Sequence, residues 1–331
     1  MAKRSSFINL SIKDIISGIR NGDRVMLGRA ITLVESKHLK HQSKGTELVN
    51  ELLKEPSKAF RIAISGSPGV GKSTFIERLG IYLVEQGHKV AVLSIDPSSD
   101  INKGSILGDK TRMERLSVHD AAFIRPSPAG DFLGGIAWRT REAVAICESA
   151  GFNIILVETV GVGQSEFKVK EMVDCFFLLL SPSGGDELQG IKKGIVEIAD
   201  IISINKCDGD LEQAAIYTRK EYSQALHLFP AKANGWNPKV ITTSSETGHG
   251  LEDSWQLMKD FHNHISSDGT IFKIRKAQNV IWFKERIAMS IHQYIQNKSE
   301  TGDLAQLQND ILSGTLSPLE AADTAIKSLL K

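Results

Sequence analysis

The sequence predicts an α/β fold with a doubly wound, mostly parallel sheet, and two patterns support that prediction. Short apolar runs alternate with helical patterns through the middle of the chain, as they do where helices connect parallel strands. The runs are apolar almost throughout, which is typical of strands covered on both faces. Strands are expected at 60–65, 89–95, 153–158, 175–180, 201–205 and 239–244. Helices are expected between them, for example over 72–85, 139–149 and 211–226.

The two ends of the chain lack such strands and show helical periodicity instead. Near the N-terminus, Ser11 and Asp14 have the three-residue spacing of a capping box, in which each side chain bonds the other residue's backbone N–H. Ser317 and Glu320 repeat this spacing near the C-terminus, with Pro318 at the first helical position. The expected parts are an N-terminal helical extension over 1–57, a central domain over 58–262 and a C-terminal helical dimerisation arm over 263–331.

An apolar stripe runs along the expected C-terminal arm. Its residues recur at three- and four-residue steps, which places them on one face of a helix of more than three turns. They are Val280, Phe283, Ile287, Ile291 and Tyr294. A helical appendage of this kind either covers its own core or forms an association surface. Because an apolar helix beyond the α/β core has little else to cover it, we expect the stripe to be buried between the subunits of a homodimer.

The composition argues against several function classes. The 331 residues carry a net charge of +1, which gives no electrostatic reason to expect binding to nucleic acid or to an anionic membrane. The strongest apolar run, 175–180, has the length of a strand and is far too short to span a membrane. Cys147, Cys175 and Cys207 form no C-x-x-C pair and are expected to be reduced, packed side chains. The first residues resemble neither a signal peptide nor a transit peptide, so a cytoplasmic location is expected.

The stretch GSPGVGKST matches G-x-x-x-x-G-K-[ST] and lies between an expected strand and an expected helix, the context that identifies a P-loop. Its glycines let backbone N–H groups surround a β-phosphate at a helix N-terminus. Lys72 can reach the β- and γ-phosphates, and the Ser73 hydroxyl can ligate Mg²⁺. The expected phosphate-binding residues are Gly66, Ser67, Pro68, Gly69, Val70, Gly71, Lys72, Ser73 and Thr74. The sequence therefore predicts a P-loop NTPase with a helical extension at each end.

The stretch NKCDG indicates that the base is guanine. The Asp208 carboxylate only accepts hydrogen bonds and can take both N1–H and the 2-amino group of guanine, a pair of donors that adenine lacks. Asn205 and Lys206 complete the motif at the end of an expected strand. A Ser-rich loop after the next strand is positioned to contact the base. Its residues are Ser244, Ser245 and Glu246. GTP is therefore expected in preference to ATP.

Three carboxylates are expected around the Mg²⁺ ion and the γ-phosphate. Asp96 ends a strand, Asp109 lies in a glycine-punctuated loop, and Glu158 begins ETVG, which has the spacing of the D-x-x-G loop of nucleotide switches. Mg²⁺ prefers hard oxygen ligands but takes few of them from the protein, so not all three need contact it. With Ser73 these residues form the expected metal site, and Lys72, Asp109 and Glu158 the expected catalytic set. Val162 stands where many GTPases have a water-orienting Gln, so unaided hydrolysis is expected to be slow.

Long motifs follow one another along the chain: GSPGVGKST, DPSS, GSILGDKTRM, FIRPSP, ETVGVGQSE, GDELQGIKKGI and NKCDG. Together they resemble the MeaB/ArgK family of P-loop GTPases. The resemblance extends into GDRVMLGRAITLVES and LSGTLSPLEAADT and so covers nearly the whole chain. It departs in PAGDFLGG, over 128–135, where the family leads us to expect a smaller and more Ser/Thr-rich stretch.

The resemblance implies a function and a partner. Members of this family are GTPase chaperones of adenosylcobalamin-dependent acyl-CoA mutases, above all methylmalonyl-CoA mutase. They gate cofactor loading and protect the enzyme, and adenosylcobalamin belongs to the partner enzyme. The family also implies a homodimer whose interface includes the helical C-terminal extensions. The loop around Gln189 and Lys192 resembles the family's additional switch, which senses the mutase.

Two alternatives remain open from the sequence. A metallochaperone GTPase belongs to the same class, but it calls for a Cys/His cluster, and the pair His262 and His264 is more typical of a helix end at the surface. Some members of the family carry an older name as kinases or ATPases of an amino-acid transport system. The guanine motif argues against that reading.

Overall fold

A computed structural model of the chain describes residues 7–36, 38–96, 113–128, 133–159, 165–182, 193–230, 232–299 and 303–329. The chain divides into two compact units, residues 1–278 and 279–331. The first unit contains the sheet and is described first; the second contains helices and is described by itself below.

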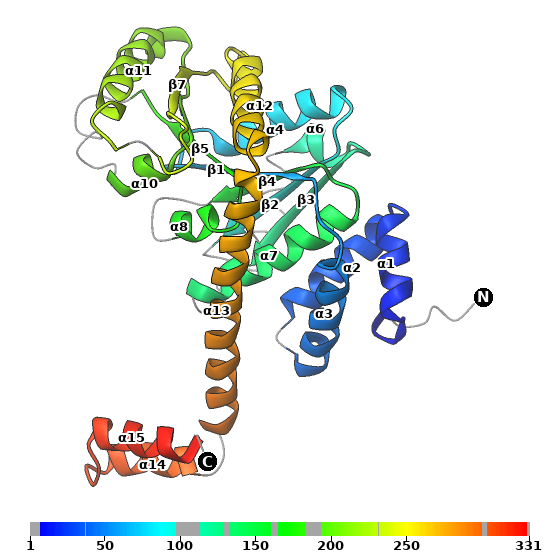
Figure 1. Ribbon diagram of the computed structural model, residues 1–331, viewed down its shortest axis with the longest axis vertical. Helices are drawn as coiled ribbons and strands as arrows, with labels where there is room; N and C mark the ends of the chain where they lie inside the picture. The colour runs from blue at the N-terminus through cyan, green and yellow to red at the C-terminus, as the bar shows by residue number, and fades with distance from the viewer. Residues whose placement is uncertain are drawn as a thin grey trace. The chain divides into compact units, whose positions relative to one another are not determined.

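The first unit is built on a seven-stranded parallel sheet with the order β3-β2-β4-β1-β5-β6-β7 (Figure 1). Its strands are β1 (Phe60–Gly66), β2 (Val90–Asp96), β3 (Ala122–Pro128), β4 (Ile154–Thr159), β5 (Cys175–Leu180), β6 (Ile201–Ile204) and β7 (Lys239–Thr242). All six strands expected from the sequence are present, within two residues at each end. The doubly wound α/β fold is thereby confirmed.

The seventh strand, β3, was not expected, because its sequence AFIRPSP contains an arginine and two prolines. A proline has no N–H to give to a ladder and is tolerated only where that side of the strand is open. β3 satisfies this condition because it lies at the edge of the sheet and pairs only with β2. Helix α2 (Arg24–Glu35) approaches the same edge, since Arg24 donates a hydrogen bond of 2.7 Å to the Ala122 carbonyl and Glu35 pairs with Arg125.

Helices cover both faces of the sheet (Figure 1). Helices α4 (Lys72–Glu85) and α12 (Leu251–Ser267) pack on one face, and α7 (Leu133–Ser149) and α8 (Ser165–Lys170) on the other. The remaining elements of this unit are the short helices η1 (Phe7–Asn9) and η2 (Gly209–Leu211), with α1 (Ile12–Arg20), α3 (Leu39–Leu52), α6 (Glu114–Ser117), α10 (Lys193–Ile198), α11 (Glu212–Leu226) and the first turns of α13 (Thr270–Ser299). The three helices expected between strands are confirmed, and α4 has the expected bounds.

The helical N-terminal segment has the local structure that its sequence predicts. Ser11 caps α1, accepting a hydrogen bond from the Asp14 N–H at 3.1 Å, while the Asp14 side chain accepts one from the Ser11 N–H. Ile15 and Ile19 of α1 are fully buried. Helices α1, α2 and α3 all contact α7, so this segment packs on the outer side of the helix that covers β2.

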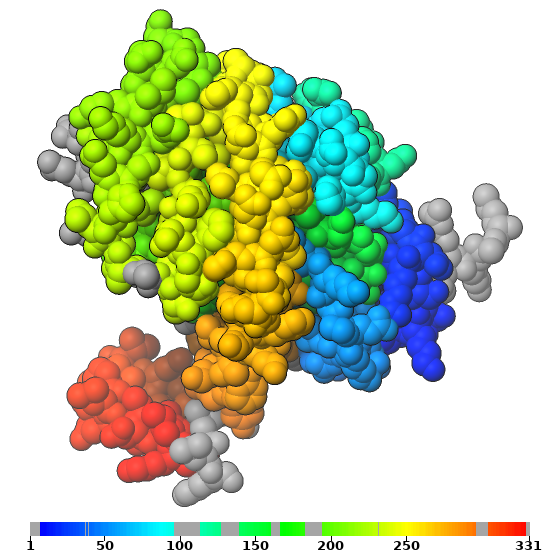
Figure 2. All heavy atoms as spheres, turned by 45° about the horizontal axis from the view of Figure 1, so that its top comes forward, coloured from blue at the N-terminus to red at the C-terminus, as the bar shows by residue number. Residues whose placement is uncertain are grey.

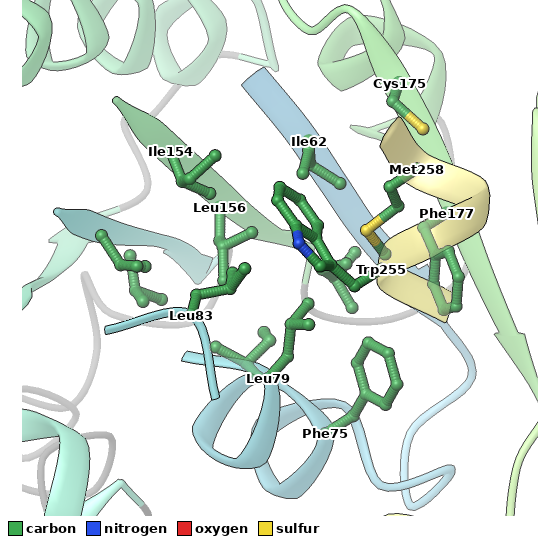
Figure 3. Close-up of a cluster of buried hydrophobic side chains, with 14 of the residues drawn as sticks. Ile62, Phe75, Leu79, Leu83, Ile154, Leu156, Cys175, Phe177, Trp255 and Met258 are labelled. Atoms are coloured by element: carbon green, nitrogen blue, oxygen red, sulfur yellow. The ribbon is translucent and has the colours of Figure 1, made fainter. Parts of the chain in front are cut away.

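A hydrophobic cluster holds the P-loop helix α4 to the sheet (Figure 3). Phe75 of α4 stacks on Phe177 of β5 with ring centroids 5.1 Å apart. Trp255 and Met258 reach the same cluster from α12, which lies beside α4 on the face seen in Figure 2. Burying a side chain of this size contributes roughly 1.5–3 kcal/mol. The helix that carries the phosphate-binding residues is thus fixed by several such contacts before any ligand binds.

The second unit consists of the rest of α13 with α14 (Asp303–Leu312) and α15 (Pro318–Leu329). Ser317 and Glu320 form the expected capping box at the start of α15, with the Ser317 hydroxyl donating to Glu320 at 2.8 Å. The five stripe residues on α13 are each between 44% and 64% exposed in the single chain. No helix in the described part of the chain is long and apolar enough to cross a membrane.

Candidate nucleotide site

The residues expected to bind nucleotide follow the carboxyl ends of four parallel strands. The P-loop follows β1, Glu158 lies near the end of β4, Asn205 comes directly after β6, and Ser244 follows β7. Because these strands are parallel, their carboxyl ends lie at the same edge of the sheet, where open α/β sheets bind ligands. The fold therefore brings the phosphate and base motifs together at one edge.

The P-loop requires glycine at two positions for lack of space. Gly71 precedes α4 with φ of 97°, a left-handed conformation that favours glycine, and an added Cβ would lie 2.7 Å from Asn205 Nδ2. At Gly66 an added Cβ would lie 2.3 Å from the Leu179 carbonyl oxygen of the neighbouring strand. These close approaches let the loop curl tightly between β1 and α4.

Lys72 is only 8% exposed, and its ammonium group lies inside the P-loop. It donates hydrogen bonds to the carbonyls of Gly66 at 2.8 Å and Ser67 at 3.0 Å. Burial lowers the pKa of Lys72, while the negative charges of Glu158 and Glu166 act to raise it. An anionic phosphate at the loop would favour the charged form in the same way, so the site is electrostatically suited to a phosphate.

A hydrogen bond joins Ser73 in the first turn of α4 to Glu158 near the end of β4. The Ser73 hydroxyl donates to Glu158 Oε1 at 2.9 Å, and the Ser94 hydroxyl of β2 donates to Glu158 Oε2 at 3.1 Å. Two adjacent oxygen ligands of an octahedral Mg²⁺ ion lie about 3 Å apart, since each Mg–O bond is about 2.1 Å long. The spacing and the chemistry of Ser73 and Glu158 therefore fit a Mg²⁺ ion at the P-loop.

Other expected residues of the metal and switch region are only partly described. Asp96 is the last residue of β2, and its backbone is in register with Pro128 of β3. Asp109, Val162, Gln189 and Lys192 lie outside the described residues. Within the described parts of the chain, no three His, Cys, Asp or Glu side chains form a cluster that could hold a metal ion.

Asn205 connects the P-loop to the loop expected at the base. Its Nδ2 group donates to the Val70 carbonyl at 2.8 Å, and its Oδ1 atom accepts hydrogen bonds from Ser245 N–H at 3.1 Å and Ser245 Oγ at 3.0 Å. The side chain is almost fully buried by these contacts. Asn205 thus sets the distance between the phosphate and base loops, a role that the motif alone does not reveal.

Asp208 lies half-buried at the mouth of the site, and Ser244 donates a hydrogen bond to its Oδ2 atom. Between Asn205 and Asp208, Lys206 has φ of 60°, which L residues seldom adopt and which costs roughly 1–2 kcal/mol. The strained turn presents the Asp208 carboxylate at the end of the motif, and Ser244 holds one of its oxygens. The carboxylate is therefore oriented before a base binds.

Two residues at the site were missed from the sequence. Ser94 orients Glu158, as described above, and Arg78 of α4 donates a hydrogen bond of 2.7 Å to the Glu246 carbonyl in the base loop. Neither belongs to a motif. Ser94 is at least a polar residue inside an otherwise apolar strand, a signal that could have been noticed, whereas nothing in the sequence indicates the contact of Arg78.

The fold and this site define a P-loop nucleotide-binding protein with the two loops of a GTPase. Comparison with known proteins agrees with that class. The sequence model of the family described as methylmalonyl Co-A mutase-associated GTPase MeaB matches residues 27–300. The chain therefore belongs to the MeaB family of GTPases, as the resemblance of its motifs predicts.

Similar proteins match most of this chain. The methylmalonic aciduria type A homolog, mitochondrial, of Mus musculus is 43% identical over 325 residues, which are 95% of this chain and 78% of that protein. The GTPase ArgK of Escherichia coli K12 is 44% identical over 276 residues, 83% of each chain. A crystal structure described as LAO/AO transport system kinase is 34% identical, with a TM-score of 0.73, and the match covers 97% of this chain and 98% of that one.

Proposed function

We propose that this protein is a GTP-hydrolysing chaperone of an adenosylcobalamin-dependent acyl-CoA mutase, in the first instance methylmalonyl-CoA mutase. Membership in a family named for its association with that mutase is the observation that carries the proposal. In this role the protein would gate cofactor loading and protect the enzyme. The cobalamin would remain in the partner, and the protein's own ligands would be GTP or GDP with Mg²⁺.

The proposed mechanism gives each site residue a physical task. Lys72 would stabilise negative charge on the β- and γ-phosphates, and Ser73 and Glu158, with Asp96 and Asp109, would hold or orient the Mg²⁺ ion. Asp208 would select guanine, supported by Ser244. With Val162 in place of a water-orienting side chain, hydrolysis by the protein alone would be slow, below the typical enzyme rate of about 10 s⁻¹. GTP hydrolysis that is slow until the partner enzyme accelerates it would suit a protein that gates cofactor loading.

A homodimer forms part of the proposal. The stripe on α13 is exposed in the single chain, and contiguous apolar surfaces of that kind commonly mark association sites. A self-complementary contact through this stripe would give a two-fold symmetric pair. We also propose the organisation expected from the sequence, with a helical N-terminal extension, a GTPase domain and a helical dimerisation arm.

One rival function is favoured by the name of a relative, the LAO/AO transport system kinase. A kinase would transfer the γ-phosphate to an acceptor and would ordinarily use ATP. The acceptor-only carboxylate of Asp208 supports guanine instead. Comparing GTP and ATP binding by calorimetry separates the two, because equal affinities would remove the support that Asp208 gives to the GTPase reading.

The test of the chaperone function is the rate of GTP hydrolysis with and without purified mutase. We expect the mutase to raise the rate, since charge stabilisation and water positioning supplied by a partner can add several powers of ten. Lys72→Ala should abolish both rates, and Lys192→Ala should retain the basal rate and lose the stimulation. A fast rate without partner, or no change on adding the mutase, would contradict the proposal.

A further inference from the structure

The P-loop and its helix α4 hold the base loop, residues 244–250, at two separate points. The first contact runs through Asn205, which joins the P-loop to Ser245. At the second, Arg78 of α4 donates a hydrogen bond of 2.7 Å from its guanidinium group to the Glu246 carbonyl. The helix that carries the phosphate-binding residues therefore also holds the loop expected at the guanine base.

The peptide group between Glu246 and Thr247 is bonded at both of its ends. Its carbonyl accepts the hydrogen bond from Arg78, and its N–H donates to the Ser244 hydroxyl oxygen at 3.0 Å. The Ser244 hydroxyl in turn donates to Asp208 Oδ2. Each group donates to the next, so an unbroken chain of hydrogen bonds runs from Arg78 to the carboxylate expected to read guanine.

The bonds of this chain strengthen one another because they all point in the same direction. A cationic donor polarises the peptide carbonyl, and this makes the N–H of the same peptide a better donor. Ser244 is only 2% exposed, so water competes little for its hydroxyl. The charge of Arg78 thereby helps to hold the Asp208 carboxylate, although a peptide group and a hydroxyl lie between them.

We propose that Arg78 is a positioning residue for guanine recognition, which acts on Asp208 through the peptide and the hydroxyl between them. The inference rests on the proposed function, because it takes Asp208 as the group that selects guanine. With the chain intact, the carboxylate is held where it can accept N1–H and the 2-amino group together. Without Arg78 the peptide can rotate away from Ser244, and the base itself must then order the carboxylate when it binds.

Binding of GTP and of ITP by the full-length protein, measured by calorimetry, tests this role. The hypoxanthine base of ITP lacks the 2-amino group, so Asp208 can accept only one hydrogen bond from it, while the phosphates are the same. Arg78→Met keeps an unbranched side chain and removes the donors. We expect GTP affinity to fall roughly 10-fold and ITP affinity by no more than about 3-fold, so the preference for GTP should narrow.

Arg115→Met is the matched control. Arg115 is exposed on α6, which contacts α4, so this variant removes the same charge and introduces the same new residue close to the same helix. It should leave both affinities unchanged. The rate of hydrolysis at saturating GTP should also be unchanged in Arg78→Met while the half-saturating GTP concentration rises, because the chain of hydrogen bonds ends at the base and not at the phosphates.

A double-mutant cycle with Ser244 tests the route of the effect. Ser244→Ala breaks the chain between Arg78 and Asp208. If the effect passes through Ser244, adding Arg78→Met to Ser244→Ala should lower GTP affinity by less than about twofold. A loss as large as that in the unmodified background would mean that Arg78 acts by another route, and it would overturn the proposal.

The remaining outcomes separate the positioning role from the proposed function. Equal losses of GTP and ITP affinity in Arg78→Met would overturn the positioning role, and so would unchanged affinities for both nucleotides. If the unmodified protein binds GTP and ITP equally well, the selection of guanine by Asp208 fails, and the role of Arg78 fails with it. Failure of the mutase to stimulate hydrolysis would count against the chaperone function and leave the role of Arg78 standing.

Discussion

The Ser73 hydroxyl donates a hydrogen bond of 2.9 Å to the Glu158 carboxylate, and this contact links the first turn of the P-loop helix to the neighbouring strand β4. Glu158 is in register with Ile64 of β1 and with Ser94 of β2, so it stands between two strands at the nucleotide edge. A charged side chain that is 4% exposed is retained at such a position only with strong partners. A Mg²⁺ ion would be the strongest of them.

Glu158→Gln tests this role directly. The amide keeps the size of the carboxylate but removes its charge and one of its two accepting oxygens. We therefore expect hydrolysis to fall roughly 100-fold and half-saturation to need more Mg²⁺. Ser94→Ala, which removes only a hydrogen bond to Glu158, should have a smaller effect. Single-turnover hydrolysis across a Mg²⁺ series measures both. An unchanged Mg²⁺ dependence in Glu158→Gln would exclude Glu158 from the metal site.

Asp208→Asn tests the choice of base. An amide cannot accept two hydrogen bonds from guanine at one edge, so we expect GTP affinity to fall by roughly 100-fold and discrimination against ATP to weaken. Ser244→Ala removes one contact to the same carboxylate and should reduce affinity by less. Calorimetry with GTP and ATP gives both affinities for each variant. Unaltered GTP preference in Asp208→Asn would show that another group reads the base.

The lowered pKa of Lys72 predicts a pH dependence of GTP affinity. Burial lowers this pKa in the nucleotide-free protein, and a bound phosphate would raise it, so binding takes up a proton at alkaline pH. We therefore expect affinity to be constant at neutral pH and to decline as the pH rises through the lowered pKa. Lys72→Arg is the control, because arginine stays charged over this pH range. Any pH dependence that comes from titration of guanine itself is the same in both proteins. Equal pH profiles of the two proteins would contradict the prediction.

The α13 stripe predicts how the protein assembles. Ile287→Asp places a charge in the centre of the stripe and should convert a dimer into monomers in sedimentation at micromolar concentration. Ala288→Asp adds the same charge at a neighbouring exposed position and should leave the dimer intact. A chain ending after Gln278 should be monomeric and still bind GTP. The cut must not fall near residue 265, because Ile271 and Arg275 beyond it pack on the first unit.

Arg275 is expected to stabilise the first unit. It donates two hydrogen bonds to the fully buried Asp174, at 2.9 and 2.7 Å, and also bonds the Ala59 carbonyl at 2.6 Å. Arg275→Ala removes the charged partner of the buried Asp174 carboxylate, so the free energy of unfolding should fall by about 3–5 kcal/mol. Lys54→Ala breaks an exposed ion pair and should change it by less than about 1 kcal/mol. Denaturant unfolding distinguishes the two variants.

Much of the fold could be predicted because its local signals agree with its tertiary structure. Strand β5 reads CFFLLL and is buried along its whole length, and the capping boxes at Ser11 and Ser317 form where their spacing places them. β3 could not be predicted in this way. Its prolines oppose a strand in any central position, and only the order of the sheet shows that β3 is at an edge.

The site could be predicted as a set of motifs but not as a network. The sequence identifies Asn205 as part of a guanine motif, yet its hydrogen bonds to Val70 and Ser245 depend on how three separate loops meet. The contact of Arg78 with Glu246 spans 168 residues and depends on the packing of α4. Such contacts follow from tertiary geometry, and no spacing rule within a single segment encodes them.

The edges of the sheet also limit how copies of this protein can aggregate. Pro126 and Pro128 deprive the open side of β3 of N–H donors, and Arg24 already occupies the Ala122 carbonyl. At the other edge, β7 is only four residues long and begins with the exposed Lys239. A strand from another molecule would find few backbone N–H donors at β3, and it would have to desolvate a charged side chain at either edge. These features oppose a fibril-like extension of the sheet. A homodimer of this protein would therefore form through surfaces made of helices.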